Sequence, residues 1–300
     1  MADNSPEVSI IMNCYNGEEF LEQAIQSVIN QSFTNWEVIF WDNLSEDQSK
    51  IIFKSFDDAR LKYHLADTHT PLYEARNFAI KKSKGQYLAF LDVDDYWEHN
   101  KLEKQLPLFN NSKVGFVCSN YLIQHELKRK SWIAFKKEIP SGFVTDELLS
   151  SYFIGLLTLM IRKEAYDSLH YGFDPKFSVM GDLDITTRLS LDWQLGSIQE
   201  VLAVCRKHGN NILVQEREKH INEMKYWIER MDRLDSIRTR SSFHKLEDNL
   251  SYQKFIHHKL QNNLKQAFKE LSSISLGMKK IRSLIIFLIP LRLLKLLKND

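Results

Sequence analysis

Apolar and polar positions along the first two thirds of the chain predict strands that alternate with helices. The run Val8–Met12 is short, β-branched and apolar, as expected of a strand buried on both faces. After a turn around Asn16 and Gly17, apolar residues recur at helical spacing from Phe20 to Ile29. The same order repeats along the chain: a strand is predicted at 36–41, a helix that carries 51–56, a strand at 61–65, a helix at 72–83 and a strand at 87–91.

Polar residues mark the ends of two of these helices. Ser45 and Gln48 have the spacing of a capping box, so we expect them to open the helix that carries Ile51. Lys84 and Gly85 follow the next helix, and a glycine at this place is typical of a helix C-terminus.

The repeated strand–helix order implies an α/β fold, with a mostly parallel, Rossmann-like sheet flanked by helices. In such sheets ligands bind at the carboxyl ends of the strands. The segments after Met12, Trp41 and Leu91 should therefore share one edge, and each of them is polar. Three polar strand ends on one edge predict a binding site there.

The pattern changes twice further along the chain. Strands at 114–119, 157–161 and 201–205 and a helix at 182–193 are expected in a less regular stretch. Beyond Gly209 the sequence predicts long charged helices, without another glycine until Gly277. We therefore expect an α/β domain over residues 1–215 and a helical C-terminal region over residues 216–300.

Composition narrows the classes of function. The chain has 40 Lys and Arg against 39 Asp and Glu, a net charge of +1, so no global attraction to nucleic acid is expected. The cysteines at 14, 118 and 205 lack metal-type spacing and predict reduced thiols. The first ten residues do not resemble a secretory signal. We therefore expect a cytoplasmic protein, either free or peripheral on the cytosolic face of the membrane.

The segment Asp92-Val93-Asp94-Asp95 has the strongest chemical character. It places three carboxylates within four residues, directly after a predicted buried strand. Like charges at this spacing repel one another unless a cation neutralises them. Mg²⁺ is commonly held by one or two carboxylates together with substrate phosphates. The run therefore suits a metal-bound diphosphate, whereas an isolated Asp-x-Asp would indicate a solvated acidic loop.

Other nucleotide-binding and hydrolytic signatures are absent from the sequence. The ten glycines form no Gly-x-Gly pair and no Gly-x-x-x-x-Gly-Lys, which excludes a dinucleotide fingerprint and a P-loop. No Gly-x-Ser-x-Gly nucleophile elbow occurs. A nucleotide diphosphate held through a metal is the interpretation that remains.

Taken together, the motifs resemble those of the family 2 inverting glycosyltransferases with the GT-A fold, of the type that builds cell-surface polysaccharides. The resemblance covers roughly residues 6 to 212 in the family's order, and it implies that residues 1–215 form the catalytic, nucleotide-sugar-binding domain. Its segments are Val8–Gly17, Ala24–Ser32, Trp41–Asp47, Ala75-Arg76-Asn77, Phe90–Asp95, Gly181–Asp184 and Arg206–Asn211.

The resemblance implies roles in holding a nucleotide sugar. Tyr15 and Asp42 would contact the nucleobase, and Asp92 would lie toward the ribose. Asp94 would be the main ligand of a divalent Mg²⁺ or Mn²⁺ ion, supported by Asp95. Further residues that would border the nucleotide or close over the diphosphate are Asp47, Arg76, Arg206 and His208. For Asp47 a charge at a helix N-terminus is an equal alternative, and for Arg76 a salt bridge on the helix is the alternative.

The resemblance also names the catalytic base. Asp182 would take the proton from the acceptor hydroxyl in a single inverting displacement. The family pattern has an acidic residue before this aspartate, whereas Gly181 stands here. Asn43 likewise replaces a second aspartate next to Asp42, from which we expect altered contacts to the base.

The last segment, from Gly277, is basic and amphipathic. Lys279, Lys280 and Arg282 precede an apolar run, and three more basic residues are interleaved with leucines at 292, 295 and 298. Such a segment can lie in the interface of an anionic membrane, where a growing or lipid-linked glycan acceptor would be met. Packing on the domain or on a second subunit of a homo-oligomer is the alternative.

Two other functions stay open from the sequence. A nucleotidyltransferase also uses a parallel sheet and acidic metal ligands, but it usually needs a glycine-rich basic segment after the first strand. A non-catalytic nucleotide-sugar sensor or membrane scaffold could keep the same fold, and the glycine at 181 is compatible with it. The donor sugar, the nucleotide and the acceptor are not specified by any pattern in the chain.

Overall fold

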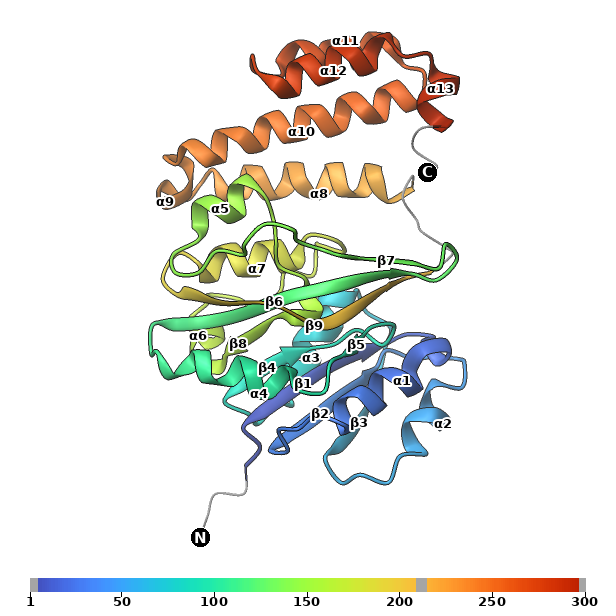
Figure 1. The fold of residues 1–300 in the computed structure, drawn as a ribbon, viewed down its shortest axis with the longest axis vertical. Coiled ribbons are helices and arrows are strands. Elements are labelled where there is room, and N and C mark those ends of the chain that lie inside the picture. The colour runs from blue at the N-terminus through green and yellow to red at the C-terminus, as the bar shows by residue number, and fades with distance from the viewer. Residues whose placement is uncertain (1–4, 209–214, 297–300) are drawn as a thin grey trace. The chain divides into compact units, whose positions relative to one another are not determined.

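The apolar runs of the first two thirds form one sheet in the computed structural model, which describes residues 5–208 and 215–296 (Figure 1). Its strands are β1 (Val8–Cys14), β2 (Trp36–Asp42), β3 (Leu61–Leu65), β4 (Tyr87–Phe90), β5 (Tyr96–Trp97), β6 (Val114–His125), β7 (Lys130–Ile133), β8 (Met160–Arg162) and β9 (Gln194–Lys207). They follow the order β3-β2-β1-β4-β8-β6-β9-β5, and β7 pairs with β6.

The sheet is mixed rather than parallel throughout. The pairs β3–β2, β2–β1 and β1–β4 are parallel, as the strand–helix order predicts. Beyond β4, the short strand β8 runs antiparallel to both β4 and β6, while β6 and β9 are long parallel neighbours (Figure 1). The parallel half therefore carries the repeated pattern, and the other half extends the sheet beside it.

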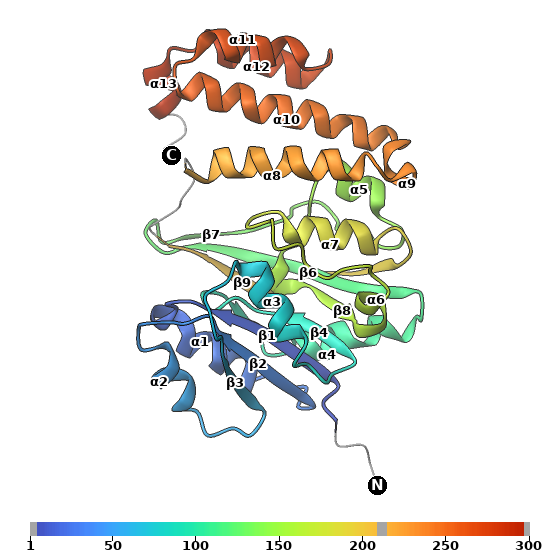
Figure 2. The same cartoon turned by 180° about the vertical axis from the view of Figure 1, so that it is seen from behind.

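Helices lie on both faces of this sheet. In Figure 1 α1 lies on the near face, and Figure 2 shows α3 on the opposite face, where it packs against β1. Four apolar residues of α1, Leu21, Ala24, Ile25 and Val28, are fully buried, as its helical spacing predicts. The bounds are α1 (Glu18–Ile29), α2 (Ser49–Lys54), α3 (Leu72–Ile80), α4 (Lys101–Gln105), η1 (Leu106–Asn110), α5 (Thr145–Ser150), η2 (Leu156–Thr158), α6 (Lys163–Asp167) and α7 (Gly181–Leu189).

The expected shared edge is confirmed by the register of β1 with its neighbours. Cys14 at the end of β1 pairs with Asp42 at the end of β2, and Ile11 pairs with Phe90 at the end of β4. The segments that follow these strands therefore leave the sheet at one edge, which we call the rim.

Three local predictions are wrong. Gln48 makes no side-chain cap bond to α2, and the Ser45 hydroxyl accepts from the N–H of Asn16 instead. Helix α3 ends at Ile80 with Lys81 as its C-cap, so Gly85 has another role. A Cβ on Gly85 would lie 2.5 Å from the backbone N of Ser9, so this glycine permits close approach to β1. The strand expected at 157–161 is instead η2 followed by β8.

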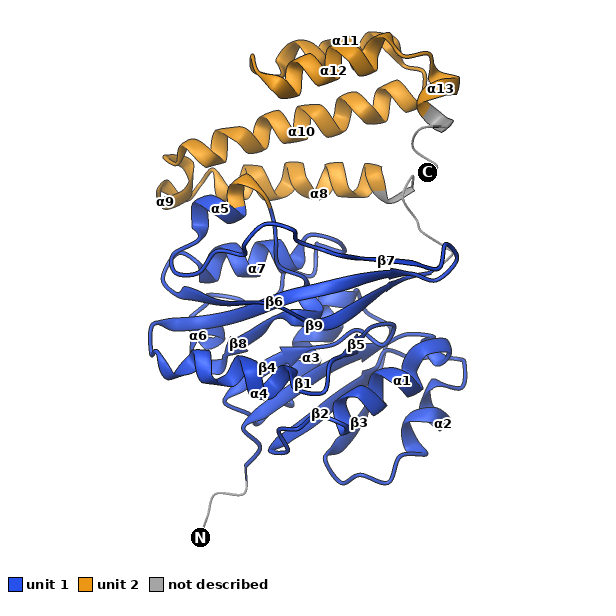
Figure 3. Cartoon of the chain, viewed as in Figure 1, with its two compact units in different colours: residues 1–148, 152–211 blue, residues 149–151, 212–300 orange. Residues whose placement is uncertain are grey.

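The chain forms two compact units (Figure 3): unit 1 contains residues 1–148 and 152–211, and unit 2 contains residues 149–151 and 212–300. The helices of unit 2 are α8 (Gln215–Met231), α9 (Asp235–Arg238), α10 (Ser241–Leu260), α11 (Leu264–Ser273), α12 (Met278–Leu288) and α13 (Leu291–Leu296). A small core of Phe255, Ile256, Ala267, Leu271 and Ile274 joins α10 to α11. Within the described residues, no helix combines the length and apolar character needed to cross a membrane.

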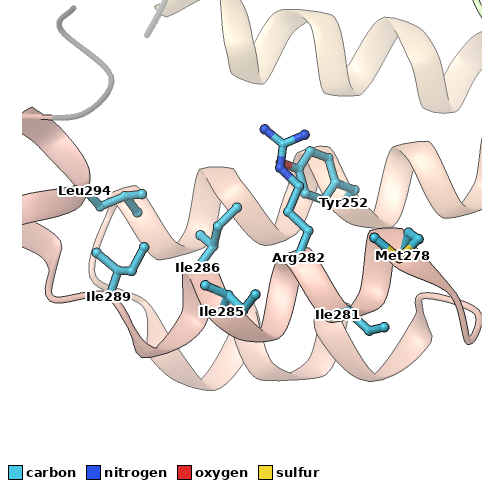
Figure 4. A pocket seen from close by; sticks show the side chains of 8 residues that line it. All are labelled: Tyr252, Met278, Ile281, Arg282, Ile285, Ile286, Ile289 and Leu294. Carbon is cyan, nitrogen blue, oxygen red and sulfur yellow. The ribbon is translucent and has the colours of Figure 1, made fainter.

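Helices α10, α12 and α13 of unit 2 border an apolar groove of about 490 Å³ (Figure 4). Its lining residues are Tyr252, Met278, Ile281, Arg282, Ile285, Ile286, Ile289 and Leu294. Most of them are aliphatic, and the charged member, Arg282, belongs to α12 together with Met278 and three of the isoleucines. The groove therefore combines a hydrocarbon-like lining with one cation.

Candidate active site at the rim

An exposed aromatic face stands at the end of β1. Tyr15 is 54% exposed, and its ring lies 4.4 Å from that of His69 between centroids. The loop of His69 is held by Asn43, whose side-chain amide donates to the carbonyl of Thr70 at 2.8 Å. An aspartate at 43 could not donate this bond, which gives a physical reason for the asparagine. The exposed ring of Tyr15 thus packs against a loop that Asn43 holds in place, and it offers a flat surface on which a nucleobase could stack.

Asp42, at the end of β2, is buried and already has two donors. The Tyr63 hydroxyl donates to Oδ2 at 2.5 Å, and the backbone N–H of Ser45 donates to Oδ1 at 2.7 Å. Burial and the adjacent Asp42 carboxylate raise the pKa of Tyr63, so the phenol stays protonated as the donor. The carboxylate of Asp42 thus holds Tyr63 and the loop at Ser45 in place beneath the rim.

Asp47 lies between two helix N-termini. Its Oδ2 accepts from the N–H of Glu18 at 2.9 Å, and its Oδ1 accepts from the N–H of Ser49 at 3.0 Å. Although burial raises the pKa of Asp47, hydrogen bonds from Ser49 and Glu18 outweigh it and lower the pKa overall. The structure therefore gives Asp47 the helix N-terminal contacts of the alternative interpretation.

Arg76 of α3 is buried, and one of its two terminal guanidinium nitrogens has no hydrogen-bond partner among the described residues. Its Nη2 donates to Oδ1 of Asp92 at 2.8 Å, whereas Nη1 is buried and has no hydrogen-bond partner among the described residues. The pKa of Asp92 is raised overall. Burial is the main cause, the charge of Arg76 opposes it, and the charge of Asp94 adds to it. A guanidinium nitrogen left without a partner is a donor that an anionic ligand could satisfy.

The end of the acidic run is organised by Arg206 of β9. The Arg206 side chain donates to the carbonyl of Asp94 at 2.8 Å and to Gln23, and its backbone N–H donates to Asp95 at 2.9 Å. Its guanidinium lies over the rings of Phe20 and Tyr96, 4.9 and 4.6 Å from their centroids. Arg206 is thus occupied by the protein itself, and it fixes the loop that presents Asp94.

Asp94 keeps an open carboxylate. Its side chain is 41% exposed, and Oδ2 lies 3.1 Å from Nε2 of His208, which is 42% exposed. Asp95 is buried, and burial first, then the charges of Asp94 and Asp92, raise its pKa well above the usual range. The structure brings together the predicted residues 92, 94, 206 and 208, while Asn210 and Asn211 of the same motif lie outside the described residues.

These residues fit a metal that arrives with a diphosphate. Among the described residues, no group of three or more His, Cys, Asp and Glu is placed to hold an ion. The protein offers Asp94 and the adjoining His208, in a loop whose carboxylates repel one another. The Asp94 carboxylate, with the remaining positions filled by phosphate and water, matches the way Mg²⁺ is usually bound beside nucleotides.

Asp182 lies at the start of α7, where helix geometry favours an ionised carboxylate. Burial raises its pKa to about 6, although the N–H of Leu183, Tyr152 and the charge of Arg76 lower it. The other acid of this motif, Asp184, is fully buried and bonded to Arg188 at 2.7 Å. Of the two, Asp182 is therefore the carboxylate available for proton transfer.

Sequence reasoning missed the tyrosines around Asp182. The charge of Asp182 raises the pKa of three tyrosines: Tyr73 of α3, the loop residue Tyr152 and Tyr121 of β6. They are far from Asp182 along the chain and belong to no motif, so a single sequence offers no signal for them.

Comparisons with known proteins show the family of the chain. A family model described as glycosyl transferase family 2 matches residues 9–167. WfgD of Escherichia coli, a UDP-Glc:alpha-D-GlcNAc-diphosphoundecaprenol beta-1,3-glucosyltransferase, is 32% identical over 166 residues, which cover 55% of this chain and 64% of WfgD. An uncharacterized glycosyltransferase of Haemophilus influenzae is 34% identical over 171 residues, 56% of this chain and 67% of that protein. The chain thus spans about two thirds of these relatives.

Two solved structures share the fold. TarS 1-349 of S. aureus in complex with UDP-GlcNAc superimposes with a TM-score of 0.65 at 17% identity, covering 94% of this chain and 80% of that one. The mannosyltransferase PcManGT from Pyrobaculum calidifontis, in complex with GDP-Man and Mn2+, has a TM-score of 0.62 at 14% identity, covering 94% and 79%. The fold is therefore GT-A, with a helical C-terminal region.

Proposed function

The chain belongs to glycosyl transferase family 2, and from this premise we propose that it transfers a sugar from a nucleotide-diphosphate sugar to an acceptor hydroxyl, with inversion. The observation that carries the proposal is the position of Arg76. The Arg76 guanidinium donates a hydrogen bond to Asp92 of the acidic run. Its positive charge also lowers the pKa of Asp182. The proposed donor-holding loop and the candidate base therefore both lie close to Arg76, within the catalytic domain that we propose over residues 1–215.

The nucleotide would lie along the rim. Its base would stack on Tyr15, above the floor ordered by Asp42 and Asp47, and its ribose would lie toward Asp92. The unpartnered Nη1 of Arg76 would donate to the diphosphate. Arg206 would act by fixing the acidic loop, because its own guanidinium is engaged by the protein.

Asp94, together with His208, would hold a divalent Mg²⁺ or Mn²⁺ ion. When bound, such an ion offsets the charge that develops on the leaving diphosphate. The protein keeps the Asp94 carboxylate exposed at the surface, on a loop that Arg206 holds in place.

Asp182 would act as the general base. Its carboxylate would take the proton of the acceptor hydroxyl while that oxygen forms a bond to the anomeric carbon. The bond from the anomeric carbon to the diphosphate breaks on the opposite face, and the diphosphate leaves with the electron pair. A base with a pKa near 6 is ionised at neutral pH yet basic enough to share the proton in the transition state.

The acceptor would be a glycan at a membrane surface, by analogy with the lipid-linked sugar in the name of WfgD. Helix α12 offers the contact, since Met278, Ile285 and Leu288 are each more than half exposed. Residues 271–299 contain six Lys and Arg and no Asp or Glu, a charge that suits an anionic bilayer. We propose that this segment lies on the cytosolic face of the membrane, with the groove of Figure 4 toward the lipid.

A panel of UDP- and GDP-sugars with Mn²⁺ tests the central proposal. Thermal shifts identify the donor that binds, and assays of that donor with water and with sugar acceptors follow. Release of nucleoside diphosphate together with a glycosylated product is expected. Binding of a donor without hydrolysis or transfer would instead favour the sensor, and release of pyrophosphate from a nucleoside triphosphate and a sugar phosphate would favour a nucleotidyltransferase.

A further inference from the structure

The glycine before Asp182 is required by a ring from another part of the chain. A Cβ built on Gly181 would lie 2.5 Å from Cζ of Tyr73 and 2.6 Å from both Cε atoms. Contacts this short do not occur for real side chains, so any residue larger than glycine must displace the ring. The family resemblance places an acidic residue here, and in this chain Tyr73 fills the space that such a side chain would need.

Tyr73 is held firmly from its other side. Its ring is 4% exposed and stacks on Phe173, with centroids 5.4 Å apart and planes 12° from parallel. Phe173 packs edge-on against Phe90 at the end of β4, and its carbonyl accepts from the side chain of Asn77 at 2.7 Å. A buried ring that also stacks on Phe173 cannot easily move away from Gly181.

The same ring links the two halves of the proposed site. A hydrogen bond from the backbone N–H of Asp182 lowers the pKa of the Tyr73 hydroxyl, and the charge of the Asp182 carboxylate raises it. The Arg76 guanidinium lies 5.1 Å from the Tyr73 ring centroid and donates a hydrogen bond to Asp92. Tyr73 therefore contacts the start of α7 and the arginine that borders the acidic run.

We propose that Tyr73 is a positioning residue that takes the place of the missing acidic side chain at 181 and fixes the orientation of Asp182. The proposal rests on the proposed function, in which Asp182 is the base. Tyr73 would touch neither donor nor acceptor. It acts by defining where α7 begins and by placing a phenol rather than a second carboxylate beside the base.

A double-mutant cycle tests the packing part of this proposal. Gly181→Ala should crowd the Tyr73 ring and displace Asp182, with kcat lower by about 100-fold and the donor KM nearly unchanged. Tyr73→Ala alone should also lower kcat, because the start of α7 loses its support. In the double mutant kcat should be at least about tenfold higher than in Gly181→Ala, because the ring that the new methyl group meets is gone.

Two further variants separate positioning from general damage. Gly115→Ala is the matched control, because a Cβ there would lie 2.5 Å from the side chain of Trp193, in a part of β6 that faces no proposed site residue. It should lower stability but leave the kcat of folded protein and its pH profile unchanged. Tyr73→Phe keeps the ring and removes the hydroxyl, so it should keep most of kcat while moving the acidic limb of the pH profile.

The outcomes distinguish this inference from the function on which it rests. If Asp182→Asn keeps normal turnover, Asp182 is not the base, and the part of the proposed function on which this inference rests is wrong. If Asp182→Asn is inactive but Gly181→Ala and Tyr73→Ala are each fully active, or their losses simply multiply, Tyr73 does not position the base and only this inference is overturned. Equal loss of kcat in Gly115→Ala would also overturn it, because the effect would then be one of overall packing.

Discussion

Nε2 of His208 lies 3.1 Å from Oδ2 of Asp94, although 114 residues separate them in the chain. Both side chains are about four-tenths exposed, so the pair faces solvent rather than the core. Phe20 packs against the His208 ring with centroids 5.0 Å apart, which gives the imidazole a fixed place. An open carboxylate with a neighbouring imidazole is a suitable pair of protein ligands for a divalent ion.

The first prediction concerns this pair. Asp94→Ala should weaken metal-dependent binding of the nucleoside diphosphate by at least about 30-fold, because it removes the open carboxylate ligand. His208→Ala should weaken it less, by about 3- to 10-fold. Isothermal titration calorimetry with and without Mn²⁺ measures both. Ala substitution of Asp67, an acidic residue outside the motifs, is a control that should change nothing, and equal affinity of Asp94→Ala and wild type with metal would contradict the assignment.

The second prediction concerns Asp182. Asp182→Asn should lower the rate of transfer by at least about 1000-fold, because the amide cannot accept the hydroxyl proton. Donor affinity should stay within about threefold, since the donor is held by residues of the rim. Asp167→Asn serves as the control, because Asp167 is an exposed aspartate paired with Lys163 and away from the rim. Near-normal turnover of Asp182→Asn would show that another group takes the proton.

A third prediction follows from the pKa of about 6 of Asp182. Burial is the main cause, and the groups that face the carboxylate are Arg76, Tyr73, Tyr152 and Tyr121. The ionised form is the active base, so kcat should fall about tenfold per pH unit below pH 6 and level off above it. The raised pKa also means that the folded state loses stability as pH rises from about 4 to 6. Asp182→Asn should therefore melt at a higher temperature than wild type at pH 7.5, and the difference should shrink toward pH 4.

Much of the fold follows from local pattern. The run from Val8 predicts β1 because a strand buried on both faces is apolar at every position, and the pattern also predicts β3 at its observed bounds, Leu61–Leu65. The rim follows from topology alone, since parallel strands end at the same edge. Acidic residues that directly follow such strands can therefore be assigned to the rim from the order of strands and helices in the chain.

Pairing at long range has no such signal in the sequence. Arg206 has a motif position, but only the structure shows that its guanidinium is packed between Phe20 and Tyr96. The link between Tyr73 and Gly181 joins two elements more than a hundred residues apart, and no periodicity reveals it. Local signals also misled: Ser45 has the spacing of a helix cap, yet its hydroxyl bonds to another loop.

A fourth prediction concerns stability and is independent of the proposed function. Lys101 is fully buried, with Nζ 4.1 Å from the centroid of the Trp97 ring and no hydrogen-bond partner among the described residues. Burial lowers the pKa of Lys101 well below its usual range, so the folded state is penalised at every pH below the pKa of a free lysine. Lys101→Met should raise the free energy of unfolding at pH 7.5 by about 1–3 kcal/mol.

Urea unfolding of Lys101→Met and wild type measures this difference at several pH values. The gain should shrink as pH approaches about 10, because the unfolded lysine then loses its proton as well. Lys50→Met is the control, since Lys50 lies on the exposed side of α2. A lower stability of Lys101→Met would mean that the contact with Trp97 outweighs the burial of the amine.

The last prediction concerns the basic, apolar face of α12. Ile285→Glu and Leu288→Glu should each weaken cosedimentation with anionic liposomes by about tenfold, because each removes apolar area from the bilayer and adds a charge that the lipid repels. Ile51→Glu is the matched control: Ile51 is 65% exposed, against 58% for Ile285, but it belongs to α2 of unit 1. Truncation after Ser275 should abolish binding, and raised salt should weaken it. If wild-type protein binds neither anionic nor neutral vesicles, the face does not contact lipid, and a dimer that Ile285→Glu dissociates in analytical ultracentrifugation would assign it to a second copy of the chain instead.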